Sequence, residues 1–114
     1  DLSFGVQGLV SVELMGPNIG ADIVLQPNGK FIVANSELTH YTPDIIIDHD
    51  FAIIRFNADG SLDASFGGDG IVITAFGDGV DIASGIVVQP DGKIVAVGVM
   101  DNGTDLDYAL VRYK

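Results

Sequence analysis

One segment of this 114-residue chain occurs twice. It reads "IVLQPNGKFIVAN" at residues 23–35 and "IVVQPDGKIVAVG" at residues 86–98. Two further pairs flank it: "DLSFGVQGLV" (1–10) with "DASFGGDGIV" (63–72), and "DFAIIRFN" (50–57) with "DYALVRYK" (107–114). We therefore expect two equivalent units, residues 1–62 and residues 63–114. Their period is just above the range of about 20–50 residues that is typical of solenoids and propellers.

Each unit is expected to form four short β-strands, because Val, Ile and Phe dominate four runs in each copy. The predicted strands are Leu9–Leu14, Asp22–Gln26, Lys30–Asn35 and Phe51–Asn57 in the first unit, and Ile71–Phe76, Gly85–Gln89, Lys93–Val99 and Tyr108–Lys114 in the second. An Asn-Gly or Asp-Gly pair separates the second and third strands of each unit. This pair predicts a type I′ hairpin turn in which Gly29 and Gly92 have a structural role.

Several of the predicted strands are apolar on both faces. In "FAIIRF" (51–56), Phe51 and Ile53 point to one side, while Ala52, Ile54 and Phe56 point to the other. A sheet with one wet face would alternate between apolar and polar residues. Four-stranded sheets stacked around an axis cover both faces. We therefore predict an all-β fold of two four-stranded antiparallel meanders, arranged like propeller blades.

Composition narrows the possible partners. The net charge is −11, and 14 of the 16 acidic residues are Asp, which prefers turns. A field of this sign repels phosphate groups, so nucleic acids and anionic membranes are not expected as partners. The longest apolar run, residues 94–100, is far shorter than the roughly 20 residues of a membrane helix. The chain has no cysteine, which excludes disulfides and thiolate metal sites.

Three segments, "LDASFGGDG" (62–70), "VVQPDGKIVAVG" (87–98) and "DYALVRYK" (107–114), resemble the Delta-60 repeat, a bacterial repeat associated with propeller-like blades. As two tandem copies, the resemblance covers almost the whole chain. The first copy departs from it at "DLSFGVQG" and in the insertion at residues 36–49. The resemblance implies a structural or surface module without an agreed chemistry, in an extracellular or cell-surface protein.

The turns supply the candidate metal ligands. "DNGTDLD" places four Asp and Asn side chains within seven residues: Asp101, Asn102, Asp105 and Asp107. Calcium is held by six to eight oxygen ligands. The EF-hand pattern is absent, however, and Asp also closes turns by accepting hydrogen bonds from local amides. We interpret these residues as turn formers, with a calcium site as the alternative, and otherwise expect no cofactor.

The insertion "SELTHYTPDIIIDHD" (36–50) contains both histidines, His40 and His49, together with Asp44, Asp48 and Asp50. Histidine and carboxylate side chains bind divalent metals. In an extended segment, however, His49 points away from Asp48 and Asp50. We therefore interpret the insertion as a solvated loop.

Two arginines occupy equivalent positions in the units, Arg55 and Arg112. Arg55 shares a strand face with Phe51 and Ile53, so its stem is expected to be buried beside a carboxylate or carbonyl partner. We predict that both arginines have a structural role, with the binding of an acidic ligand as the alternative.

Three functional hypotheses remain. The first is a non-catalytic propeller repeat module with a structural or binding role. The second is a lactonase-like propeller hydrolase or lyase with an axial metal. The expected inner strands, residues 9–14 and 71–76, carry Glu13 as their only charged residue and so favour the first hypothesis. The third hypothesis is a calcium-stiffened adhesin segment. Two blades leave outer sheet faces uncovered, so self-association is also expected.

Overall fold

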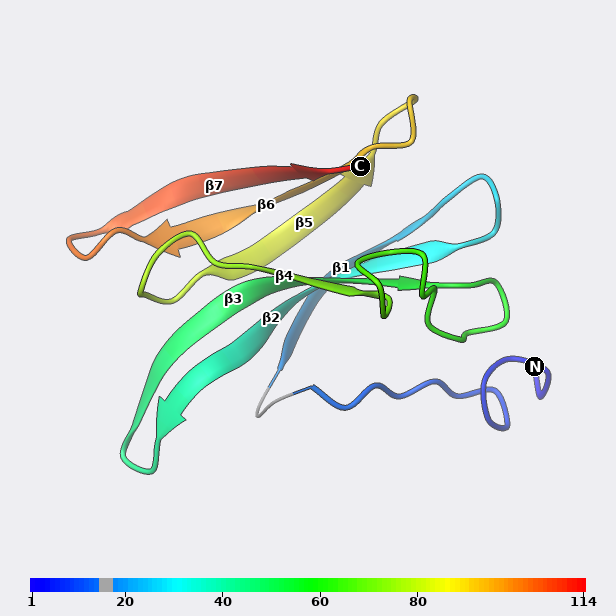
Figure 1. The fold of residues 1–114 in the computed structure, drawn as a ribbon, viewed down its shortest axis with the longest axis horizontal. Helices are drawn as coiled ribbons and strands as arrows, with labels where there is room; N and C mark the ends of the chain where they lie inside the picture. The colour runs from blue at the N-terminus through cyan, green and yellow to red at the C-terminus, as the bar shows by residue number, and fades with distance from the viewer. Residues whose placement is uncertain (15–17) are drawn as a thin grey trace.

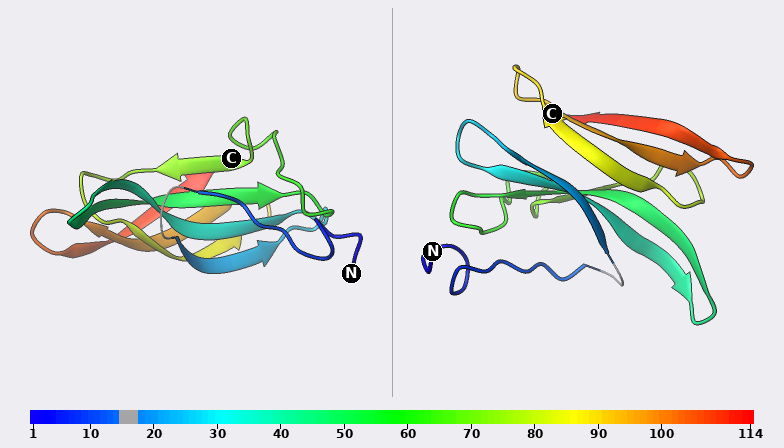
Figure 2. Two further views of the ribbon diagram at one scale, coloured as in Figure 1. Left: turned by 90° about the horizontal axis from the view of Figure 1, so that it is seen from below. Right: turned by 180° about the vertical axis from the view of Figure 1, so that it is seen from behind.

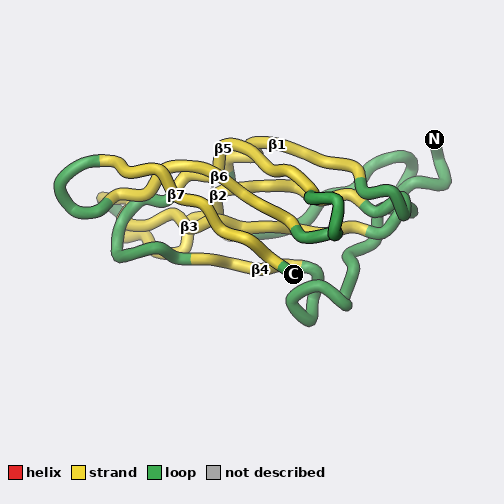
Figure 3. The backbone as a smooth tube through the Cα atoms, turned by 90° about the horizontal axis from the view of Figure 1, so that it is seen from above, coloured by secondary structure: helices red, strands yellow, loops and turns green. Residues whose placement is uncertain are grey.

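The computed structural model describes residues 1–14 and 18–114, without the side chains of residues 41 and 45–47. These residues contain seven β-strands and no helix (Figures 1 and 3). The strands are β1 (Ile19–Leu25), β2 (Phe31–Thr42), β3 (Ile45–Phe56), β4 (Ile71–Thr74), β5 (Ile82–Val88), β6 (Ile94–Asp101) and β7 (Leu106–Tyr113). The described residues accordingly offer no helix that could cross a membrane.

The strands form two antiparallel sheets. The first sheet has the order β1-β2-β3-β4, and the second has the order β5-β6-β7. Each sheet is a meander, in which strands that are consecutive in the chain lie side by side. The prediction of an all-β, blade-like fold is confirmed. The second sheet differs from the expected four strands, because it has three in the described part of the chain.

The sheets do not follow the expected division at residues 62 and 63. Strand β4, which was assigned to the second unit as Ile71–Phe76, pairs with β3 and completes the first sheet. The equivalent segment Leu9–Leu14 was expected to be a strand and is not one; it has only an isolated bridge between Val6 and Leu9. In the described residues Leu9–Leu14 has no sheet edge beside it, and a strand needs a partner for its backbone groups.

The turns at Gly29 and Gly92 have the predicted position but a different type. A type I′ turn needs positive φ at both central residues, whereas only the glycines have it here, at 83° and 84°. The amide of Gly29 donates to the carbonyl of Gln26, and the amide of Gln26 donates to the carbonyl of Lys30. This is a type I turn followed by a glycine bulge, and the Pro at its second position favours it over type I′.

The hydrophobic core lies between the two sheets (Figure 2). Strand β5 lies against β1, β2 and β3 of the first sheet. The buried side chains are Ile32, Ala34, Phe51 and Ile53 from the first sheet and Ala83, Ile86, Ile94, Ala96 and Ala109 from the second. The contact is so close at Gly98 that an added Cβ would lie 2.6 Å from Phe51 Cζ. The two sheets therefore cover each other through one face each.

The insertion is part of the first sheet. Instead of forming a solvated loop, residues 36–50 lengthen β2 and β3 into a long hairpin that curves away from the rest of the sheet (Figure 1). Ser36, Glu37, His49 and Asp50 are buried near its base. The interpretation as a loop was therefore wrong, because the polar residues of this stretch lie on paired strands.

Candidate functional site

A short segment between β3 and β4, at the start of the second unit, packs against residues of the first unit. We call residues 63–70, "DASFGGDG", the second hook. The Asp63 carboxylate accepts hydrogen bonds from the amide and the hydroxyl of Ser65, at 3.1 and 2.7 Å. The amide of Gly70 donates to the carbonyl of Phe66 at 2.7 Å. These local bonds fold the segment back on itself just before β4.

The second hook is clamped to the edge of β3. The other oxygen of Asp63, Oδ2, lies 2.6 Å from Lys30 Nζ and 2.7 Å from Arg55 Nε. The guanidinium of Arg55 also lies 4.6 Å above the ring centroid of Phe66 and donates to the hydroxyl of Ser65. Backbone bonds between Arg55 and residues 63 and 70 complete the contact. A strand edge, an ion pair and a stacked ring thus hold the same segment.

The clamp changes the acidity of Asp63. Hydrogen bonds from Lys30 and Ser65, with the nearby charge of Arg55, hold the pKa of this carboxyl well below its ordinary value. Asp63 is therefore ionised throughout the physiological pH range, and its ion pairs persist there. The sequence predicted a carboxylate or carbonyl partner for Arg55, and it indicated Asp63 only as a turn residue. The signal for Asp63 was its recurrence as Asp1 at the start of the first unit.

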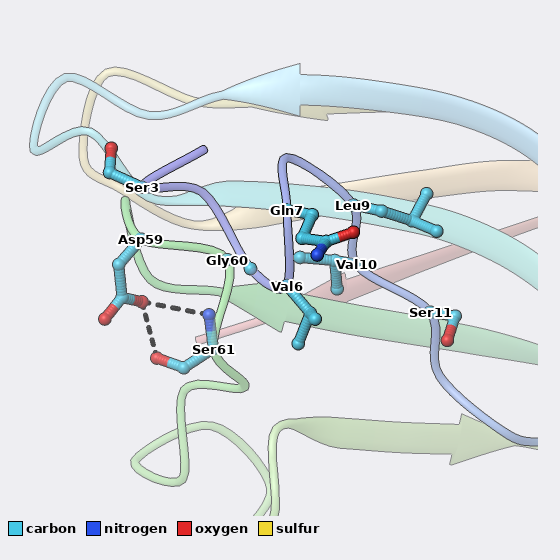
Figure 4. A pocket seen from close by; sticks show the side chains of 10 residues that line it. Ser3, Val6, Gln7, Leu9, Val10, Ser11, Asp59, Gly60 and Ser61 are labelled. Atoms are coloured by element: carbon cyan, nitrogen blue, oxygen red, sulfur yellow. Dashed lines mark hydrogen bonds between the residues drawn. The ribbon is translucent and has the colours of Figure 1, made fainter. Parts of the chain in front are cut away.

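Residues 1–8, "DLSFGVQG", form a first hook with the same local fold. The Asp1 carboxylate accepts hydrogen bonds from the amide and the hydroxyl of Ser3, at 2.9 and 2.7 Å. The amide of Gly8 donates to the carbonyl of Phe4 at 2.9 Å. This hook lies beside the turn at residues 57–61, and the two enclose a pocket (Figure 4). Asp59, the one carboxylate lining the pocket, already accepts two hydrogen bonds from Ser61.

The second sheet has residues equivalent to Lys30 and Arg55, but in the described residues no hook packs against them. Arg112 corresponds to Arg55 and Lys93 to Lys30. Lys93 pairs locally with Asp91 at 2.8 Å, and both side chains are substantially exposed. Within the described residues, the exposed Arg112 has neither a hydrogen bond nor an ion pair. The structure therefore bonds Arg55 directly to a carboxylate, whereas Arg112 has only the nearby charge of Asp91, which already pairs with Lys93.

A second group of charged residues is buried near the base of the insertion hairpin. Asp81 is fully buried and Asp50 nearly so. Asp81 accepts a hydrogen bond from the amide of Phe76 at 2.8 Å, and its own amide donates to the carbonyl of His49 at 2.6 Å. One oxygen each of Asp48, Asp50 and Asp81 is buried without a hydrogen bond. Sequence reasoning placed Asp48 and Asp50 in the insertion and Asp81 in an Asp-rich turn, and it did not connect them.

Two members of this carboxylate cluster (Asp48, Asp50 and Asp81) have raised pKa values. Burial, together with the charge of Asp50, raises the pKa of Asp48 and of Asp81 above the ordinary value of 3.8. The described residues contain no group of three or more His, Asp or Glu side chains placed to hold a metal ion.

The Asp-rich turn after β6 is closed by its own hydrogen bonds. The side-chain amide nitrogen of Asn102, Nδ2, donates to Asp105 Oδ1 and to Asp107 Oδ2, both at 2.8 Å. The amide of Gly103 donates to Asp101 Oδ1 at 2.8 Å. The structure thus brings Asn102, Asp105 and Asp107 together, whereas the carboxylate of Asp101 is bonded to the backbone of Gly103. It also places a hydrogen-bond donor, Asn102 Nδ2, between the carboxylates of Asp105 and Asp107.

The innermost strands differ from the expected ones. Residues 71–76 lie at the edge of the first sheet, whereas β1 and β5 lie next to each other where the two sheets meet. The charged residue on these two strands is Asp22, not Glu13. Its carboxylate accepts hydrogen bonds from the amides of Ile23 and Ile86, at 2.9 and 3.0 Å. Asp22 therefore links the sheets through backbone groups.

Comparison with known families gives one match. Residues 49–66 and 89–114 match a domain of unknown function described as a β-propeller (DUF5122). The matched segments include all of β6 and β7, the last two thirds of β3 and the start of the second hook. Neither a curated protein nor a solved structure matches the chain. The sheet topology and this match together support a β-propeller-like repeat family for the chain.

Proposed function

We propose that this chain is a non-catalytic repeat module of a β-propeller-like protein. Its repeats are of the Delta-60 kind, and its role is structural or binding, in a bacterial surface or secreted protein. The observation that carries the proposal is the clamp on Asp63, in which Lys30 and Arg55 converge on one carboxylate. These charged groups join consecutive repeats.

Other polar groups that an axial catalytic site would need have structural contacts. Asp22 of β1 accepts backbone amides from both sheets. The carboxylates of the turn at residues 101–107 accept hydrogen bonds from the side chain and backbone of that same turn. A general base or a metal ligand must instead present its free oxygens to an open site. Both observations favour a module without its own chemistry.

The net charge of −11 fits a module exposed at a surface or outside the cell. Such a charge keeps the protein soluble and repels nucleic acids and anionic lipids. Location is open to direct measurement. In the source bacterium, the protein should be degraded by protease added to intact cells, or recovered from the medium. Recovery in the soluble interior alone would contradict this part of the proposal.

The catalytic alternative is tested with the purified protein. Lactones and uronic-acid polymers would be incubated with it, in the presence of calcium, magnesium, manganese or zinc. We expect product formation at the rate of the buffer control. Turnover above that rate would overturn the proposal if it is lost in Asp22→Asn or in Asp81→Asn, because Asp22 bonds to both sheets and Asp81 is fully buried. A matched variant, Asp105→Asn, removes a distant surface charge.

A further inference from the structure

We propose that the first hook and residues 9–12 of one molecule dock on the free edge of β7 in a second molecule. This contact would repeat between chains the one that the second hook and β4 make with β3 within a chain. The inference rests on the proposed function as a repeat module and names its partner, which is a second copy of this chain.

The edge that receives the segment is open. Strand β3 pairs with β2 on one side and with β4 on the other. Its equivalent β7 pairs with β6, and in the described residues nothing lies along its other side. An open strand edge presents a row of backbone donors and acceptors and accepts an added strand.

The sheet face beside this edge is apolar and exposed. Ile53 of β3 is 0% exposed, whereas its equivalent Leu110 is 66% exposed. Tyr108 and Val97 belong to the same open face, and their equivalents in the first sheet, Phe51 and Ala34, are fully buried. In the first sheet, this face packs against the second sheet. The equivalent face of the second sheet has nothing packed on it in the described residues.

The complementary face of the first sheet is exposed along β1, whereas Ile54 and Phe56 of β3 on the same face are buried. In the second sheet, Ile86 packs into the core at 5% exposure, whereas its equivalent Ile23 in β1 is 62% exposed. One molecule thus exposes one face on its second sheet and one on its first sheet. The equivalents of these two faces pack against each other inside the molecule. Such faces fit head to tail, which leads to a closed ring or to an open fibre.

The docking segment is already folded for its role. The two hooks share their Asp-Ser and Phe-Gly hydrogen bonds, and the glycine that follows the Phe in each, Gly5 or Gly67, has a φ of 58° or 65°. A segment that keeps its shape on binding loses little conformational entropy. The first hook is therefore prepared for the contact that the second hook makes.

The equivalence also predicts the register. In the first sheet, Ala52 lies opposite Ile73, and Ile54 lies opposite Ile71. The corresponding pairs between molecules are Ala109 with Ser11 and Val111 with Leu9. Asp1 would take the place of Asp63 beside Lys93 and Arg112 of the other molecule. Phe4 would lie under the guanidinium of Arg112, as Phe66 lies under that of Arg55.

The first hook is proposed to dock on β7 of a second molecule and not on β7 of its own molecule. The first hook is held on its own first sheet, with the amide of Gly5 bonded to the carbonyl of Asp59 and the ring centroid of Phe4 5.8 Å from that of Phe31. Figures 1 and 2 show it at the opposite side of the molecule from β7. These contacts do not prevent docking, since Phe66 likewise contacts both Arg55 and Tyr113.

Cysteine cross-linking tests the register directly, because the chain has no cysteine of its own. Ser11→Cys and Ala109→Cys would be purified as separate single variants, mixed and oxidised. We expect a disulfide-linked dimer that contains one copy of each variant. In the control mixture, Ser11→Cys is combined with Leu110→Cys. A shift of one residue points the side chain to the opposite face, so this mixture should form far fewer mixed dimers.

The charge clamp provides a second test that does not depend on cysteines. Asp1→Ala should weaken self-association, measured by light scattering across a dilution series, by at least about tenfold, since charge-assisted hydrogen bonds are among the stronger polar contacts. The matched variant Asp105→Ala removes the same charge outside the contact and should leave assembly unchanged. Both variants should keep the β-sheet circular dichroism of the parent.

The outcomes separate this inference from the function on which it rests. A wild-type protein that stays monomeric at all concentrations, or equal cross-linking in both mixtures, would overturn the docking and leave the non-catalytic module standing. Catalytic turnover would contradict the proposal of a non-catalytic module and would leave the cross-linking result unchanged.

Discussion

Strands β3 and β7 have related sequences and opposite environments. "DFAIIRF" in β3 and "DYALVRY" in β7 share their polar positions and their apolar pattern. Phe51 of β3 is 0% exposed, and the equivalent Tyr108 of β7 is 87% exposed. The difference comes from neighbours, since β3 has β4 along its edge and the second sheet over its face. The comparison teaches that the burial of a repeat is completed by the next repeat.

The largest effect is expected from truncating the two aromatic residues of this comparison. Phe51→Ala leaves a cavity where the two sheets meet and should lower the free energy of unfolding by about 3–5 kcal/mol. Tyr108→Ala removes a side chain that is solvated in the single molecule. Under dilute conditions it should change the stability by less than about 0.5 kcal/mol. Urea unfolding, followed by circular dichroism, measures both.

Measurements at high protein concentration distinguish the two variants further. At high concentration, Tyr108→Ala should reduce self-association, because Tyr108 belongs to the open apolar face of the second sheet. A stability loss at Tyr108 as large as that at Phe51 in dilute solution would mean that β7 is covered within one molecule. The comparison between the two strands would then fail.

The same pair of strands shows what the sequence could predict. The duplication gave the all-β class, the hairpin positions and the burial of both faces of β3, because these depend on local pattern. The duplication could not show where one sheet ends and the next begins. Two copies of a repeat can be divided into sheets at any position along the repeat, and each division fits the sequence equally well. Residues 71–74 join the preceding sheet because β3 offers them an edge. Leu9–Leu14, with a similar sequence, lacks an edge in the described chain.

The two equivalent arginines give the next effect. Arg55→Ala removes a partner of Asp63, the donor to Ser65 and the cation over Phe66, so the melting temperature should fall by several degrees. Arg112→Ala should leave the melting temperature of the single molecule nearly unchanged. Arg55→Lys keeps the charge without the planar group and should fall between the wild type and Arg55→Ala. Equal losses at both arginines would contradict the distinction between an occupied and an empty clamp.

The insertion shows a limit of a different kind. Its polar composition predicted a solvated loop, yet residues 36–50 extend β2 and β3. Polar residues on a strand are buried when another segment covers them, and here the segment around Asp81 lies against His49. Asp81 is 31 residues away in the sequence from Asp50 and belongs to the other unit. No local pattern connects these two carboxylates, so the cluster could be found only from the fold.

The buried carboxylates are expected to give a moderate effect that depends on pH. Burial and neighbouring charge raise the pKa of Asp48 and of Asp81 above 3.8. The folded protein therefore binds more protons than the unfolded chain above that pH, and these two groups lower the stability as the pH rises through their raised pKa values. Asp81→Asn removes one of the charges and should raise the melting temperature at neutral pH by a few degrees.

The control for this prediction is the clamp, which has the opposite sign. The pKa of Asp63 is lowered, so its contribution is present above about pH 4 and is lost as the solution becomes more acidic. Asp63→Asn should therefore destabilise the protein at neutral pH. If Asp81→Asn destabilises it equally at neutral pH, then the hydrogen bond from Phe76 outweighs the charge, and the proposed cause is wrong.

The smallest effect is expected from calcium at the turn of residues 101–107. A cation there would need the oxygens of Asp105 and Asp107, and both already accept hydrogen bonds from the side-chain amide of Asn102. Binding would have to break these two bonds and turn the amide, whereas the equivalent hairpin between β2 and β3 lacks this arrangement of residues. We therefore expect millimolar calcium to leave the melting temperature within a degree or so of its value in magnesium. A ligand at 100 times its dissociation constant adds about 2.7 kcal/mol to stability, so binding would be visible. A rise of several degrees that is specific to calcium and disappears in Asp105→Asn would show that the second sheet differs from the first by a metal site as well as by its open face.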